Sequence, residues 1–66
     1  MMKPIINEKG AVVAYEHQRS ATRNELLSRS GGLLAWHDRN TDQTFDRHGK
    51  RAGFGDLTKK FIPEDK

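Results

Sequence analysis

One turn signature occurs three times in this chain, each time in similar sequence surroundings. Residues 7–10, 28–31 and 46–49 each begin with Asn, Ser or Asp and end with Gly. In a hairpin loop of this kind the first side chain accepts hydrogen bonds from backbone N–H groups, and the Gly adopts a positive φ angle. The repeat therefore predicts β-hairpins that turn through a Gly bulge. The predicted structural turn residues are Asn7, Gly10, Ser28, Gly31, Asp46 and Gly49.

Each turn sets the register of the strands beside it, so Ile5 is expected opposite Val13 and Leu26 opposite Leu34. Side chains alternate between the faces of a strand, which places the aromatic residue that ends each copy on the same face as these positions. We expect this aromatic-bearing face to be the core. The predicted core residues are Ile5, Val13, Tyr15, Leu26, Leu34, Trp36 and Phe54.

The opposite face of the predicted hairpins is also apolar in the first two copies. Its candidate protein contacts are Ile6, Val12, Leu27 and Leu33. A strand that is apolar on both faces is buried on both, and exposed apolar patches commonly mark association sites. This second face is therefore expected either to contact another chain or to pack beneath residues 17–24 or a C-terminal strand.

These patterns predict a mainly all-β fold, in which repeated hairpins form a small meander or a pseudo-symmetric barrel or flower. A single domain is expected over residues 1–66, with a frayed tail at 63–66. Residues 22–25 have the form of a helical capping box, so a short helix within 20–30 is an alternative to a strand there. The last apolar group, Leu57, Phe61 and Ile62, is expected to form a closing strand.

The strand–turn–strand repeat that ends in Gly or Ala and an aromatic residue resembles the small bacterial four-fold β-flower domains. Residues 44–54 carry the resemblance most fully, residues 6–15 come next, and with the middle copy it covers about half of the chain. The resemblance implies hairpins arranged around a pseudo-four-fold axis and no established activity. The polar segment 17–24 and a shortened C-terminal unit depart from that pattern. Residues 44–54 also look like the tyrosine–aspartate repeats of large secreted shell proteins, which occur in long arrays.

The composition limits both the core and the cross-links that could support it. The chain has 66 residues, of which 33% are hydrophobic and none is cysteine. Disulfides and thiolate metal sites are thereby excluded, and so small a core is expected to be marginally stable or to be buried against a second copy. No apolar stretch approaches the roughly 20 residues that cross a bilayer, so no membrane contact is expected and a cytoplasmic location is the default.

The sequence offers little for catalysis. His17, His37 and His48 have no recognised metal-ligand spacing, and the serines are explained as loop and turn residues. A nucleophile needs a base that a third group holds in place, and no such combination stands out. We expect no catalytic residue, no metal residue, no cofactor and no small-molecule ligand, and therefore no enzyme.

Basic residues gather in two stretches of the chain, and the net charge is +3. The candidate nucleic-acid contacts are Arg47, His48, Lys50, Arg51, Arg19, Arg23 and Arg29. The leading interpretation is a small non-enzymatic interaction module that binds a protein partner or itself, of a composition compatible with a bacterial or phage accessory protein. The alternatives are a small basic nucleic-acid-binding β domain and, less favoured, a metal-dependent enzyme.

Overall fold

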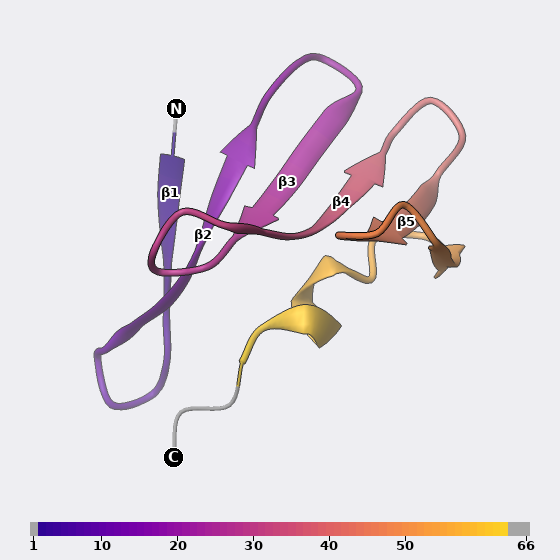
Figure 1. Cartoon of the computed structure of the whole chain (residues 1–66). Coiled ribbons are helices and arrows are strands. Elements are labelled where there is room, and N and C mark those ends of the chain that lie inside the picture. The colour runs from indigo at the N-terminus through magenta and orange to yellow at the C-terminus, as the bar shows by residue number, and fades with distance from the viewer. Residues whose placement is uncertain (1, 64–66) are drawn as a thin grey trace.

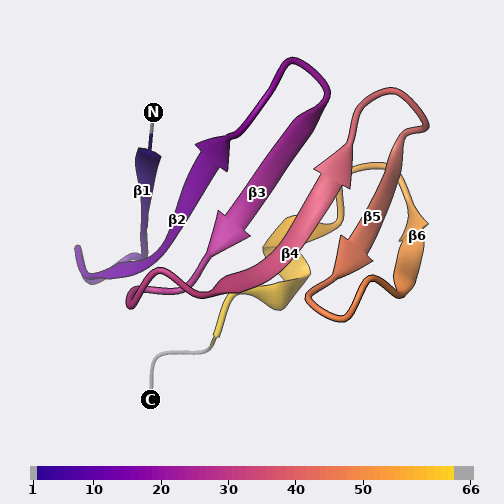
Figure 2. The same ribbon diagram turned by 45° about the horizontal axis from the view of Figure 1, so that its top comes forward.

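The computed structural model describes residues 2–63 and shows a single antiparallel sheet. Six strands cross it in chain order, so each strand pairs with its neighbour in the sequence (Figure 1 and Figure 2). The strands are β1 (Met2–Ile6), β2 (Val12–Gln18), β3 (Arg23–Leu27), β4 (Leu33–Asp38), β5 (Gln43–Asp46) and β6 (Arg51–Phe54). A short 3₁₀ helix, η1 (Thr58–Phe61), follows the last strand.

The predicted all-β fold is confirmed. The sheet is an open meander and is not closed into a barrel. Residues 23–27 form β3, so the alternative of a short helix in this segment is wrong. The predicted closing strand is also wrong, because residues 58–61 form η1. From residue 64 onward, the predicted frayed tail lies outside the described residues.

The three repeated turns share one backbone hydrogen-bond pattern, and the first and third also share a side-chain pattern. In the first, Asn7 Oδ1 accepts hydrogen bonds from the backbone N–H groups of Lys9 and Ala11 at 2.9 and 3.0 Å. Asp46 Oδ1 accepts the equivalent bonds in the third turn, from residues 48 and 50. The φ angles of residues 10, 31 and 49 are +83°, +94° and +84°, a region that costs little only for glycine. Local chemistry thus fixes each hairpin.

A β-bulge follows each of these turns and changes the register that the turn alone predicts. Beyond the first turn, Ile5 pairs with Ala14 rather than with Val13. The same shift occurs in the second and third hairpins, where Leu34 and Ala52 are the extra residues. Because a bulge inserts one residue into one strand, every later side chain of that strand moves to the opposite face.

The bulges therefore place the tiny residues, and not the aromatic residues, on the core side of the sheet. Ala14 and Ala35 are fully buried and Leu26 is 1% exposed, whereas Phe54 is 66% exposed. The prediction of an aromatic core face is wrong for this reason, although Leu26 itself is buried as predicted. The other predicted core residues are only half-buried: Ile5, Val13, Tyr15, Leu34 and Trp36.

The C-terminal segment covers the core side of the sheet, which we call the η1 face and define by Ala14, Leu26, Ala35 and Thr44. Helix η1 packs against β3, β4 and β5. The buried hydroxyl of Thr44 donates to the carbonyl of Gly55 at 2.7 Å and accepts from the N–H of Leu57 at 2.9 Å. Because both bonds are made inside the protein, a single buried hydroxyl fixes the start of the covering segment.

Candidate binding surface

The sheet face opposite η1 is not covered by any other described element. We call it the open face and define it by Ile6, Val12, Tyr15, Leu27, Leu33, Trp36, Phe45 and Phe54. Ile6 and Phe54 are 55% and 66% exposed, and the other members are half-buried. A single-layer sheet with one apolar face unpaired lacks the second layer that small domains normally have.

The strand register makes the apolar part of the open face continuous. Tyr15 pairs with Leu27, and Leu27 pairs with Leu33, so these side chains stand beside one another across three strands. Ile6 and Val12 form the cross-strand pair next to them. The four residues predicted as protein contacts thus lie on one face, and the bulges bring aromatic residues to the same face.

Aromatic and guanidinium groups stack on one another in the second half of the open face. The rings of Trp36 and Phe45 are stacked, with centroids 4.5 Å apart and planes at 21°. The guanidinium of Arg23 lies 4.0 Å from the Trp36 ring centroid, and that of Arg51 lies 5.2 Å from the Phe54 ring centroid. Such contacts hold long side chains flat against the sheet and fix the shape of the surface.

A buried carboxylate marks the polar border of this surface. The side chain of Glu25 is 7% exposed, and its Oε2 accepts a hydrogen bond from Arg23 Nε at 2.8 Å. Arg19 lies 3.7 Å from the other carboxylate oxygen. The cross-strand neighbour His17 has a buried Nδ1 with no hydrogen-bond partner among residues 2–63. Sequence reasoning missed Glu25, since only the register shows that it stands between His17 and Trp36.

The residues predicted to contact nucleic acid are divided between the two ends of the sheet. Four of them lie in or beside the turns at residues 28–31 and 46–49, which fall at the same end of the strands (Figure 2): Arg29, Arg47, His48 and Lys50. Arg19 and Arg23 lie at the opposite end and are held by the carboxylate of the polar border. Arg51 lies on the open face against Phe54, and Arg23 lies on the same face against Trp36. The structure thus does not bring the two basic stretches into one cluster.

Electrostatics in the third turn centre on Asp46. Hydrogen bonding from the backbone N–H of Lys50 is the main cause that holds the pKa of Asp46 below its usual value of 3.8. Slight desolvation opposes this effect, and the N–H and imidazole of His48 add to it. The carboxylate of Asp46 therefore stabilises the turn. Among the described residues it forms no ion pair with the basic side chains around it.

Metal-ligand side chains do not gather in one place in the described part of the chain. Within residues 2–63, no cluster of His, Asp and Glu side chains has the arrangement needed to hold a metal ion. His37 is 8% exposed, and its Nε2 lies 3.0 Å from Asp42 Oδ1, which is a structural contact between β4 and the following turn. In the same part of the chain, no helix is long and apolar enough to span a membrane.

Comparisons with known proteins leave the identification open. No protein-family model, no curated protein and no solved structure matches this chain. The resemblance to four-fold β-flower domains therefore stays a prediction. What the molecule can do has to be inferred from the open face and from the cavities of the fold.

Proposed function

We propose that this chain is a non-enzymatic interaction module that binds a second copy of itself through the open face. The observation that supports the proposal is the continuous row of apolar and aromatic side chains that no described element covers. Large apolar patches of this kind mark protein-association sites more often than they remain in water.

The small core of the chain is the energetic reason to expect a second copy on the open face. The buried hydrophobic residues are Ala14, Leu26 and Ala35, and only one of them has a large side chain. Burial of a large apolar side chain stabilises a protein by about 1.5–3 kcal/mol, so the uncovered leucines and aromatic residues are the main reserve of stability in this chain. A second sheet packed face to face on the first would use that reserve and form a β-sandwich.

The dimensions of the molecule agree with such an interface. It extends 34 × 23 Å in its two longer directions. A stable protein interface buries roughly 800 Å² on each partner, which is comparable with the area of one face of this sheet. In a two-fold dimer the same face serves both partners, so a single self-complementary surface is sufficient.

The test introduces a charge into the apolar row of the open face. Leu33→Asp is expected to convert the dimer to a monomer, because a carboxylate buried between two sheets without a partner is strongly unfavourable. The matched control is Thr41→Asp, which adds the same charge at an exposed turn. Molar mass is measured by light scattering after gel filtration, with the NMR spectrum of each variant recorded to establish that it is folded. A wild-type chain that is monomeric at millimolar concentration would overturn the proposal.

A second candidate function is single-stranded nucleic-acid binding, and one observation favours it. Phe54 is 66% exposed at the edge of the open face, and the guanidinium of Arg51 lies over one side of its ring, 5.2 Å from the centroid. An exposed ring offers a surface on which a base can stack, worth about 1–3 kcal/mol, while the arginine can contact phosphate. Arg47 and Lys50 in the adjoining turn extend the positive charge.

This alternative is tested with a fluorescently labelled single strand at two salt concentrations. If it is correct, Phe54→Ala and Arg51→Ala weaken binding, and affinity falls steeply as salt increases. Lys9→Ala, in the distant first turn, serves as the control for loss of one positive charge. Equal weakening by the control and by Arg51→Ala would indicate non-specific attraction and would remove this candidate.

A further inference from the structure

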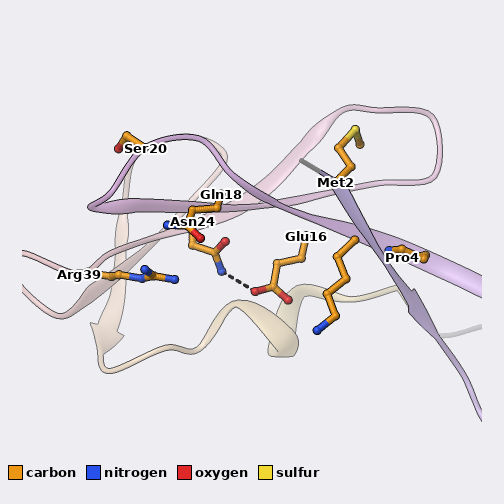
Figure 3. A pocket seen from close by; sticks show the side chains of 8 residues that line it. Met2, Pro4, Glu16, Gln18, Ser20, Asn24 and Arg39 are labelled. Carbon is orange, nitrogen blue, oxygen red and sulfur yellow. Dashed lines mark hydrogen bonds between the residues drawn. The ribbon is translucent and has the colours of Figure 1, made fainter.

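A pocket of about 590 Å³ lies on the η1 face where η1 does not reach. Helix η1 packs against β3, β4 and β5, so the part of this face formed by β1, β2 and the start of β3 remains open. The polar side chains that line the pocket are Lys3, Glu16, Gln18, Ser20, Asn24 and Arg39 (Figure 3). Met2 and Pro4, on the edge strand β1, complete the lining.

The strand register explains why polar groups meet here. Lys3 is opposite Glu16, and Gln18 is opposite Asn24, on the same face that carries the buried alanines and Leu26 further along the strands. Asn24 is 5% exposed, and its Nδ2 donates to Glu16 Oε1 at 2.8 Å. A buried amide that orients a carboxylate toward an open cavity is typical of a ligand site.

Arg39 comes from a different part of the chain. It lies in the turn between β4 and β5, and its backbone N–H donates to the carbonyl of Thr22 at 2.7 Å. This bond ties the two loops at that end of the sheet together. In Figure 3 the guanidinium of Arg39 points toward the Asn24–Glu16 pair. A cation is thereby held at the rim of the pocket by backbone structure.

The pocket carries both signs of charge, and each group keeps bonding capacity. The ion pairs of the described residues do not include Lys3 or Arg39. A carboxylate accepts about four hydrogen bonds, and Asn24 supplies one of them to Glu16. Ser20 Oγ accepts hydrogen bonds from the N–H groups of residues 22 and 23, so its own O–H is oriented as a donor.

We propose that this pocket binds a small zwitterion, with the anionic group of the ligand on Arg39 and its ammonium group on Glu16. A ligand with only an anionic group would be repelled by Glu16, and a ligand with only an amine would be repelled by Lys3 and Arg39. A zwitterion matches both signs of charge. A small-molecule ligand could not be expected from the sequence, since the lining residues come from β1, β2, β3 and distant turns. The site is on the face opposite the proposed dimer interface, so either proposal can fail without the other.

The experiment is an amide-resolved NMR titration of the full chain with matched probes. 4-Aminobutyrate carries both charges, butyrate carries only the anion, and butylammonium carries only the cation on the same carbon chain. Saturable shifts centred on Glu16, Gln18 and Asn24 are expected with 4-aminobutyrate. Homologues with shorter and longer spacers, from glycine to 6-aminohexanoate, then define the best separation of the charges.

Variants of the charged pocket residues test which residue binds which charged group of the ligand. Arg39→Gln and Glu16→Gln are each expected to weaken binding of the zwitterion by about tenfold or more, since each removes a hydrogen bond to a charged group. Lys9→Met, in the distant first turn, is the control and retains full affinity. The dimer-interface variant Leu33→Asp is also expected to retain it. Equal binding of butyrate, the same affinity in the two pocket variants, or the absence of saturable shifts with every probe would overturn the proposal.

Discussion

At the residue scale, small side chains decide which face of the sheet becomes the core. Ala14, Ala35 and Gly53 occupy equivalent positions in the three hairpins, and each lies opposite the larger residue of a cross-strand pair. The first two are fully buried, and the third lies beneath Leu57 of the covering segment. Tiny residues let a neighbouring segment approach the backbone, and their repetition is the sequence signal for the core face.

Gly53 provides a test, because the equivalent residue in the other hairpins is alanine. A Cβ atom at Gly53 would lie 2.9 Å from Leu57 Cδ1, and the φ angle of +155° is one that side-chain-bearing residues rarely adopt. Gly53→Ala is therefore expected to lower the free energy of unfolding by about 1–3 kcal/mol, measured by urea denaturation. Gly32→Ala is the control, since its Cβ would meet only Ser28 Oγ at 3.4 Å. An unchanged free energy of unfolding for Gly53→Ala would show that alanine is tolerated at this position, as it is at the equivalent positions of the other two hairpins.

Asp46 makes the stability of the third hairpin depend on pH. Backbone hydrogen bonds hold its pKa in the folded chain below the usual value of 3.8. Stability from this group is therefore present above that value and is lost as the pH falls through the lower folded pKa. Asp46→Asn keeps the Oδ1 acceptor but does not titrate, so its stability profile is expected to be flatter in acid. Thermal unfolding from about pH 6 to about pH 2 measures the difference, and parallel profiles would contradict this account.

At the element scale, the turns could be predicted from the sequence and the bulges could not. A turn such as residues 46–49 is specified by Asp46, whose carboxylate accepts hydrogen bonds from the N–H groups of residues 48 and 50, and by Gly49 with its positive φ angle. A bulge at Val13 or Leu34 is not specified by bonds within the turn, so the register beyond it is seen only in the folded sheet. The same limit applies to the sites. Residues on one strand face, such as Ile6 and Val12, could be predicted together, whereas the placement of Arg39 and Lys3 around one pocket depends on the tertiary fold.

The covering segment depends on Thr44, which links β5 to the chain that leads into η1. Thr44→Val removes the hydroxyl and leaves the buried N–H of Leu57 and the carbonyl of Gly55 without these bonds. A loss of about 1–3 kcal/mol is expected. Hydrogen exchange at Leu57 N–H should accelerate more than exchange within β2. Thr41→Val, at an exposed turn, is the control, and unchanged exchange at Leu57 would show that η1 is held by other contacts.

Partial burial and hydrogen bonding have opposite effects on the pKa of Asp56, which lies in the covering segment just before η1. Desolvation raises the pKa of Asp56, but hydrogen bonds from the hydroxyl and N–H of Thr58 outweigh it, so the net pKa lies below 3.8. The charged form of Asp56 thus helps to hold the first turn of η1. This arrangement stabilises η1 at neutral pH and weakens as the pH falls through the folded pKa.

At the scale of the whole molecule, the two faces of the sheet have different roles. The η1 face contains the small core and, beyond the reach of η1, the polar pocket. The open face carries most of the large apolar side chains, including the stacked pair Trp36 and Phe45. A sheet of this size with one uncovered apolar face is marginal as an isolated layer, which is why a second copy is proposed to complete it.

The central claim is that the open faces of two copies pack against each other. The most direct measurement is an isotope-filtered NOE experiment on a mixture of labelled and unlabelled chains. We expect intermolecular NOEs from the Trp36 ring to the methyl groups of Leu27 and Leu33, together with a dimer mass in solution. A monomer mass at the same concentration, with Trp36 fluorescence freely quenched by iodide and no intermolecular NOE, would contradict the claim.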